Sequence, residues 1–206
     1  MRPFGALSLV SLLALAGCIT VSGRVGAVSD LDDVAERINA QQGTDFSGSM
    51  TTTGYGVGGE MYGMFGAQLA RTVAAQTSTA TSGETQELRV EQADVELNLA
   101  YPIAQVGPIM LSPGLSLTHR TTGLRYLRDG DLATFDDETA LILRPHLKVV
   151  TSVGAHAIVS AGAGYEFAFL EDPVGGPGGG AYASGSAGPQ ANVTLTYFFC
   201  SGCVGK

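Results

Sequence analysis

The chain has 206 residues, of which 45% are hydrophobic and only 15% are charged. It is acidic, with 19 Asp and Glu residues against 11 Lys and Arg residues and a formal net charge of −8 at pH 7. Because binding to a phosphate backbone needs clustered basic residues, this balance argues against a nucleic-acid partner. The length predicts a single folded domain, and the low charged fraction predicts a body with part of its surface facing lipid.

The first 17 residues predict a cleaved export signal. Arg2 supplies a positive charge, and the apolar stretch 4–15 is too short for a transmembrane helix. This stretch leads into the run Leu-Ala-Gly-Cys at 15–18, which resembles the lipobox of bacterial lipoproteins. The resemblance implies cleavage before Cys18, a diacylglycerol on the Cys18 sulfur and a further acyl chain, such as palmitate, on the new amine. No Asp follows Cys18, so the resemblance implies the outer membrane as the destination.

Residues 18–45 predict an anchor, a tether and one short helix. Asp30 can cap this helix, and Leu31, Val34 and Ile38 follow at helical spacing. Gly43 can end it, because glycine readily adopts the left-handed conformation of a helix C-terminus. A short apolar alternation at 19–27 is a weak candidate for a strand.

Residues 46–200 predict an all-β domain. Apolar and polar residues alternate in six segments, and the apolar residue is always odd-numbered, which is typical of strands with one apolar face. The segments are 55–69, 93–101, 109–117, 141–149, 157–169 and 189–199. With 19–27 and 46–53 as weaker members, the pattern predicts an antiparallel up-and-down β-barrel of about eight strands, with 201–206 as a tail.

The connections alternate in length. Short links at 102–108 and 152–156 alternate with long links at 72–87, 128–138 and 171–187, which is typical of small outer-membrane barrels. Because facing residues share a face, each hairpin needs an odd number of loop residues. A tight turn with Gly154 satisfies this rule, whereas a two-residue turn at Asp129-Gly130 violates it and predicts a β-bulge near 136–138.

Alternation alone leaves the orientation of the apolar face open. A membrane barrel turns it toward lipid, whereas a soluble carrier turns it inward around an apolar ligand. Aromatic residues at the strand ends and complementary charges on the polar face favour the membrane form. The strand that ends at Phe199 also resembles the C-terminal closing strand of outer-membrane barrels, although seven residues follow it.

The charged residues that are the best candidates for a binding or catalytic role lie on the polar face. They are Asp94, Glu96, Arg144, His146 and Lys148. An acid–base set or an anion site is one interpretation, and an ion-paired barrel interior is the favoured one, because buried charges need partners.

Cys200 and Cys203 form a C-x-x-C pair that predicts a disulfide in an oxidising compartment, since no βαβ pattern supports a thioredoxin-like redox role. Gly54, Gly56 and Gly59 match a dinucleotide fingerprint as a string, but without its strand–helix context. The sequence contains no nucleophile elbow and no histidine spacing typical of a metal site, so we expect no catalytic residue, cofactor or metal.

The combined prediction is a non-catalytic lipoprotein of the outer membrane, with a structural or interaction role in the cell envelope. Its expected partner is membrane lipid, through the acyl anchor at Cys18 and the barrel surface. The alternatives are a soluble, lipid-tethered barrel that binds an apolar ligand and, as a weaker candidate, an enzyme that modifies envelope lipids.

Overall fold

The computed structural model describes residues 18–28, 31–61, 65–128, 131–134, 137–171, 174–175, 181–182 and 188–199. The predicted signal 1–17, and both Cys200 and Cys203, lie outside these residues. Within the described part of the chain, no helix has the length and hydropathy needed to cross a membrane.

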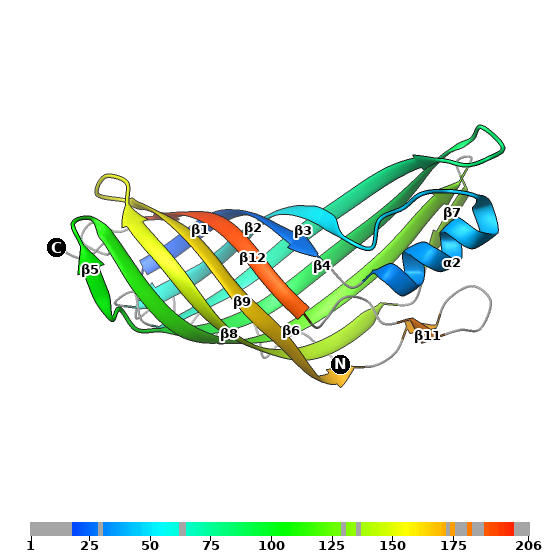
Figure 1. The fold of residues 1–206 in the computed structure, drawn as a ribbon. Coiled ribbons are helices and arrows are strands. Elements are labelled where there is room, and N and C mark those ends of the chain that lie inside the picture. The colour runs from blue at the N-terminus through cyan, green and yellow to red at the C-terminus, as the bar shows by residue number, and fades with distance from the viewer. Residues whose placement is uncertain are drawn as a thin grey trace.

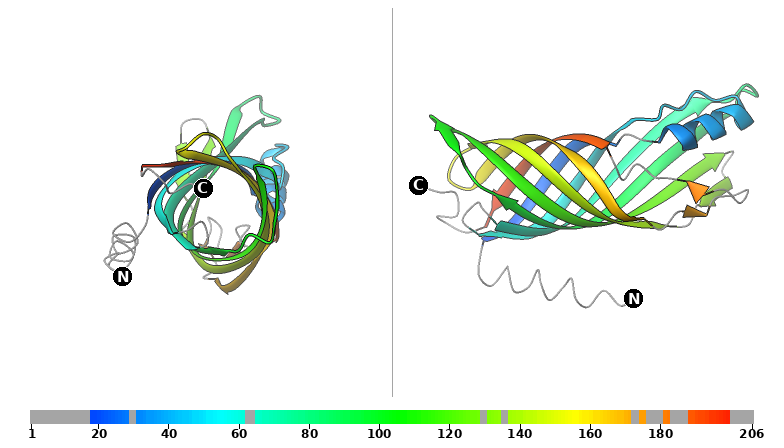
Figure 2. Two further views of the ribbon diagram at one scale, coloured as in Figure 1. Left: turned by 90° about the vertical axis from the view of Figure 1, so that its left-hand side faces the viewer. Right: turned by 60° about the horizontal axis from the view of Figure 1, so that its bottom comes forward.

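Eight antiparallel strands close into an up-and-down barrel, as the alternation predicted (Figures 1 and 2). The strands are β1 (Cys18–Val28), β2 (Met50–Met61), β3 (Phe65–Thr79), β4 (Thr85–Ala100), β6 (Ile109–Arg128), β8 (Glu138–Ser152), β9 (Ala157–Glu171) and β12 (Gly188–Phe198). Each pairs with the next, and β12 pairs with β1 to complete the wall. The short strands β5 (Ala104–Val106) and β7 (Asp131–Thr134) pair with the two ends of β6, while β10 (Val174–Gly175) pairs with β11 (Ala181–Tyr182).

Several strands begin or end elsewhere than the sequence predicted. The segment 55–69, expected as one strand, contributes to both β2 and β3. Most of the expected long link 72–87 is strand, because β3 and β4 stay paired as far as Thr79 and Thr85. The expected tether range 18–45 includes β1, whose first residue, Cys18, already pairs with Glu60 of β2. Pairing with neighbouring strands extends these strands beyond their apolar alternation.

The barrel has two different ends. The turn end holds Cys18, Phe199 and the described connections 101–108 and 153–156, and the loop end holds the connection 80–84 and the only helix of the described residues. Gly154, in the 153–156 turn, has a φ of +73°, as expected for a tight turn. Near the loop end, β6 pairs Thr122 with Glu138 but Arg125 with Thr134. The register of the described pairs therefore shifts by one residue between Thr122 and Arg125, as predicted.

The helix α2 (Asp32–Gln42) closes the inner side of the loop end. It ends at Gly43, whose φ is +64° and whose N–H donates to the Asn39 carbonyl oxygen at 2.8 Å. Leu31 occupies the N-cap position, one residue after the Asp30 that the sequence suggested. The helix lies beside the ends of the long strands β3, β4 and β6 (Figure 1). The apolar residues of α2 pack against inward-facing residues of these strands. We call this cluster the cap core: Leu31, Val34, Ala35, Ile38, Phe46, Met50, Ala74, Leu88, Val90 and Leu124.

Candidate functional site: the ion-paired barrel interior

The two faces of the wall differ in polarity, and their orientation decides between the two readings of the alternation. Odd-numbered apolar residues lie on the outside, where Leu147 is 47% exposed and Leu195 is 54% exposed. Even-numbered polar residues point inward, where Ser116 is fully buried and Glu166 is 1% exposed. This is the membrane-barrel arrangement, and it is the reverse of what a carrier of an apolar ligand needs.

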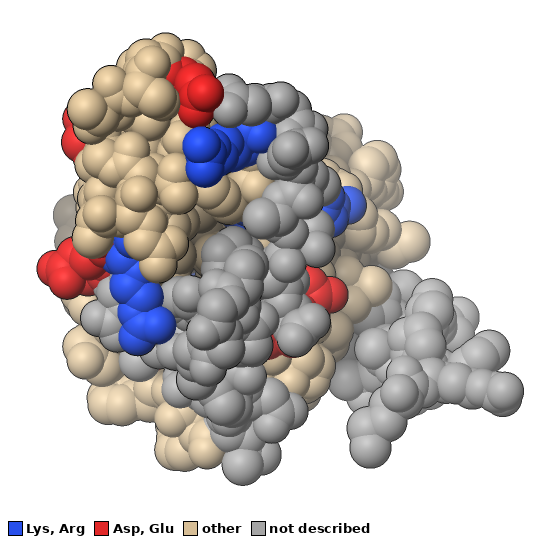
Figure 3. Space-filling model, turned by 90° about the vertical axis from the view of Figure 1, so that its right-hand side faces the viewer, with Lys and Arg blue, Asp and Glu red and all other residues tan. Residues whose placement is uncertain are grey.

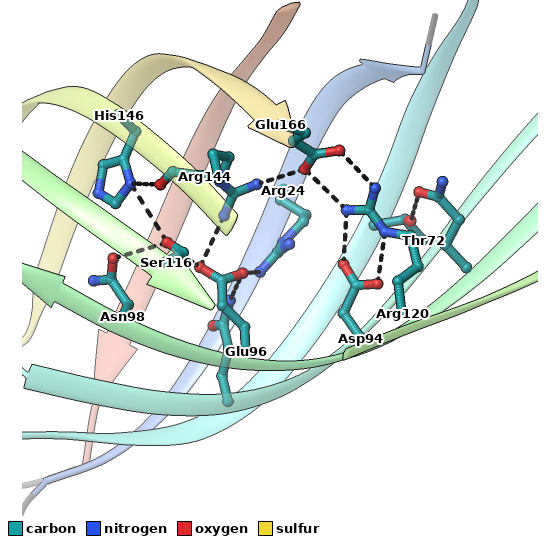
Figure 4. Close-up of polar contacts among 12 residues, drawn as sticks. Arg24, Thr72, Asp94, Glu96, Asn98, Ser116, Arg120, Arg144, His146 and Glu166 are labelled. Carbon is teal, nitrogen blue, oxygen red and sulfur yellow. Dashed lines mark hydrogen bonds and ion pairs between the residues drawn. The ribbon is translucent and has the colours of Figure 1, made fainter. Parts of the chain in front are cut away.

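Buried charges fill the middle of the barrel and are joined by ion pairs (Figure 4). Arg120 Nε lies 3.0 Å from Asp94 Oδ1, and Arg120 Nη1 lies 2.7 Å from Glu166 Oε2. Arg144 Nη2 lies 2.9 Å from Glu96 Oε1, and Arg144 Nη1 lies 3.3 Å from Glu166 Oε1. Glu166 therefore links the two arginines. Arg24 extends the group with a looser contact of 3.6 Å to Glu96.

Strand register explains why these particular charges meet. Asp94 of β4 lies directly opposite Arg120 of β6, so their inward side chains are neighbours. Arg144 of β8, the strand next to β6, and Glu166 of β9, the strand after that, reach the same layer of the interior. Because a buried charge without a partner is strongly destabilising, these contacts are what allow so many charges inside a narrow barrel.

His146 and Lys148 lie closer to the turn end than the ion pairs do. His146 Nδ1 lies 3.4 Å from Ser116 Oγ and 3.2 Å from the Arg144 carbonyl oxygen. Its ring occupies space left by Gly114, where an added Cβ would lie 2.4 Å from His146 Nε2. Lys148 Nζ donates to Asn98 Oδ1 at 3.4 Å. Both residues thus lie beside the ion pairs on the same strand, facing inward.

Three members of the group were not singled out from the sequence: Arg24, Arg120 and Glu166. All three are even-numbered and lie in or next to segments with period-two alternation, so parity alone places them on the polar face. A search for charged residues at even positions in or next to the alternating segments would therefore have identified all three. Gly54, Gly56 and Gly59 lie within β2, which is paired on both sides, so they belong to the wall.

Among the described residues, the interior around the ion pairs leaves little room for a ligand. The space lined by Arg144, His146, Lys148 and their neighbours has a volume of about 10 Å³, which is about the room that one water molecule needs. Toward the loop end, the cap core fills the inside of the long strands. Among the described residues, no group of three or more His, Cys, Asp or Glu side chains is arranged to hold a metal ion. The ion pairs therefore hold the strands of the wall together, and together with the cap core they fill the inside of the barrel.

Comparisons with known proteins agree on the fold. No protein-family model and no curated protein matches the sequence. Among solved structures, Neisserial surface protein A (NspA) is similar to 88% of this chain and 96% of its own, with a TM-score of 0.52 and 11% identity. The outer membrane protein OprG from Pseudomonas aeruginosa is similar to 90% of this chain and 97% of its own, with a TM-score of 0.51 and 14% identity. The fold is that of a small outer-membrane β-barrel.

The outer surface has the features expected of an outer-membrane barrel. Outward aromatic residues form two groups, Tyr101, Tyr197 and Phe199 at the turn end and Tyr165, Phe167 and Phe169 nearer the loop end. Aromatic residues at these levels are typical of the membrane–water interfaces. Viewed from the loop end, acidic and basic residues are spread around the rim of the barrel (Figure 3). We call the apolar wall between these two levels, which includes Leu147 and Leu195, the belt.

Proposed function

We propose that this chain is a non-catalytic lipoprotein of the outer membrane, in which a closed barrel spans the bilayer and acts through its surfaces in a structural or interaction role. The observation that carries this proposal is the outward apolar belt around a buried, ion-paired interior. Such a barrel needs lipid on its outside, and the described interior around the ion pairs has no room for a substrate.

The position of Cys18 fits a lipid anchor. It begins β1 at the rim of the turn end, and the next residue, Ile19, is 47% exposed on the outer face. Acyl chains attached at Cys18 would start at the rim of the barrel, where they can enter the membrane leaflet on the turn-end side. Each buried CH₂ group contributes about 0.8 kcal/mol, and two or more chains make membrane attachment stable.

Cys18→Ser should abolish acylation, because the hydroxyl does not replace the thiol as the lipid acceptor. Metabolic labelling with a fatty acid measures this loss, and a Cys200→Ser variant with an intact Cys18 is the matched control. Full labelling of the Cys18→Ser protein would show that this residue carries no lipid.

The same variant separates membrane spanning from lipid tethering. Produced without residues 1–17, Cys18→Ser protein should still need detergent to remain dispersed, because its belt stays apolar without the acyl chains. Size-exclusion chromatography with and without detergent is the measurement. A folded monomer in plain buffer would contradict a membrane-spanning barrel and support a soluble domain tethered by lipid.

We also propose that Cys200 and Cys203 form a disulfide in the exported protein. A lipidated Cys18 leaves these two as the remaining cysteines of the mature chain, and exported proteins meet oxidising conditions. Intact mass after alkylation without a reductant should show no added alkyl group. Two added groups would show that both thiols are free.

A further inference from the structure

The outer face of β3, β4 and β6 changes from apolar to charged part-way along the strands. Leu97 lies opposite Leu117, and one step toward the loop end Val95 lies opposite Leu69. Beyond them the first Arg and Glu residues on the outer face are Arg71, Glu91, Arg89 and Arg125, with uncharged outward residues such as Ala93 and Thr121 between them. On β3 the change takes place within two residues, from Leu69 to Arg71, so the charges begin at the border of the belt on the loop-end side.

These four residues form what we call the arginine cluster, in which three guanidinium groups share one carboxylate. Arg71 Nη2 lies 2.8 Å from Glu91 Oε2, Arg89 Nε lies 3.0 Å from Glu91 Oε1, and Arg125 Nη2 lies 3.6 Å from Glu91 Oε2. The arginine side chains are 53%, 45% and 46% exposed, respectively. Each therefore keeps N–H groups that face the surroundings.

Other acidic groups nearby do not balance the cluster. Glu87 is on the same strand and face as Glu91, and Asp137 lies beside Gly123. Among the described contacts, neither forms an ion pair with the three arginines. The cluster itself thus has two positive charges in excess.

The strand register makes this excess costly. Arg89 and Arg125 are directly opposite each other on paired strands, and like charges at opposite positions are destabilising. Glu91 reaches both, but it also accepts the hydrogen bond from Arg71. A further anion placed between Arg89 and Arg125 would relieve the repulsion, and the guanidinium group suits phosphate because it offers paired N–H donors.

We propose that the arginine cluster binds the phosphorylated headgroup of a membrane lipid, whose acyl chains lie along the belt below it, against residues such as Leu69, Val95 and Leu97. The inference rests on the proposed placement of the barrel in a membrane. Its support is the coincidence of two features, unbalanced arginines and an apolar wall that begins at Leu69, two residues from Arg71. A lipid phosphate lies at such a border, and basic residues near an anionic membrane surface attract it.

The test is a lipid titration of the folded protein in neutral detergent micelles, followed by native mass spectrometry. The probes are phosphatidic acid, phosphatidylcholine with the same acyl chains, and inorganic phosphate. We expect phosphatidic acid to bind at least about tenfold more tightly than phosphatidylcholine, and the triple variant R71Q/R89Q/R125Q to lose about 10- to 100-fold of this affinity. Glu91→Gln should raise the affinity, because it removes the only carboxylate of the cluster.

The double variant R37Q/R128Q is the matched control, because it removes two positive charges from the loop end and leaves the cluster intact. Equal binding of phosphatidic acid by the wild-type protein and the triple variant would overturn the proposal, as would an equal loss in the control. Full competition by millimolar inorganic phosphate would also overturn it, since the site would then recognise phosphate without the lipid. The micelle assay does not depend on detergent-free solubility, so its failure is distinct from a failure of the proposed membrane location.

Discussion

Arg120→Met should destabilise the folded barrel by about 3–5 kcal/mol, which is the usual cost of removing one partner from a buried ion pair. Arg120 contacts both Asp94 and Glu166 inside the wall, and its side chain is 7% exposed. The substitution keeps most of the volume and leaves the Asp94 carboxylate without a cation. The free energy of unfolding, measured by urea titration of the protein in micelles, gives the cost. Because the chain has no Trp, circular dichroism or electrophoretic mobility follows the transition.

Two further variants make this measurement specific to the buried contacts. Arg125→Met removes an exposed arginine from the outside of the same strand and should cost about 0–1 kcal/mol. Asp94→Asn in the Arg120→Met background should recover part of the loss, because it removes the unpaired carboxylate. Equal small losses for Arg120→Met and Arg125→Met would mean that the interior ion pairs do not stabilise the barrel.

Leu147→Arg should cost about 2–4 kcal/mol in a lipid bilayer, as an arginine facing the hydrocarbon region does in other barrels. Leu147 lies in the belt, between its partners Pro113 and Ala163. Leu127→Arg is the matched control, because Leu127 also faces outward but pairs with Glu87 beyond the arginine cluster. It should cost about 0–1 kcal/mol, since that position lies outside the hydrocarbon region.

Both substitutions remove an outward leucine, so the difference between their costs reports the depth of each position in the membrane and not the loss of leucine packing. Unfolding in phospholipid vesicles measures both. If Leu147→Arg and Leu127→Arg have the same small cost, the belt does not face lipid, and the outward apolar residues need another explanation.

The local pattern of the chain determined the strand faces. Period-two alternation with apolar residues at odd positions is a local property, because successive side chains of a strand point to opposite sides. It placed Leu147 and Leu195 on one face and Arg144 and His146 on the other before any pairing was known. The same parity located the register shift before Glu138, since one extra residue exchanges the two faces.

The extent of β3 and β4 was not predictable in this way. Residues 74–91 carry Ala, Thr, Gln and Glu with little apolar alternation, so the local pattern resembles a polar loop. In the structure residues 74–79 and 85–91 are strand because the two segments pair with each other and β4 also pairs with β6, and because α2 covers their inner face with the cap core. Neither the partner strand nor the covering helix is part of the local pattern.

The direction of the apolar face and the choice of ion-pair partners also came only from the tertiary structure. By itself the sequence determined that this chain makes antiparallel strands with one apolar face each. It did not determine that β1 closes on β12, or that Glu166 of β9 reaches both Arg144 on neighbouring β8 and Arg120 on β6. Those contacts join residues far apart in the chain, and they depend on the tilt and stagger of the closed wall, which is a property of all eight strands together.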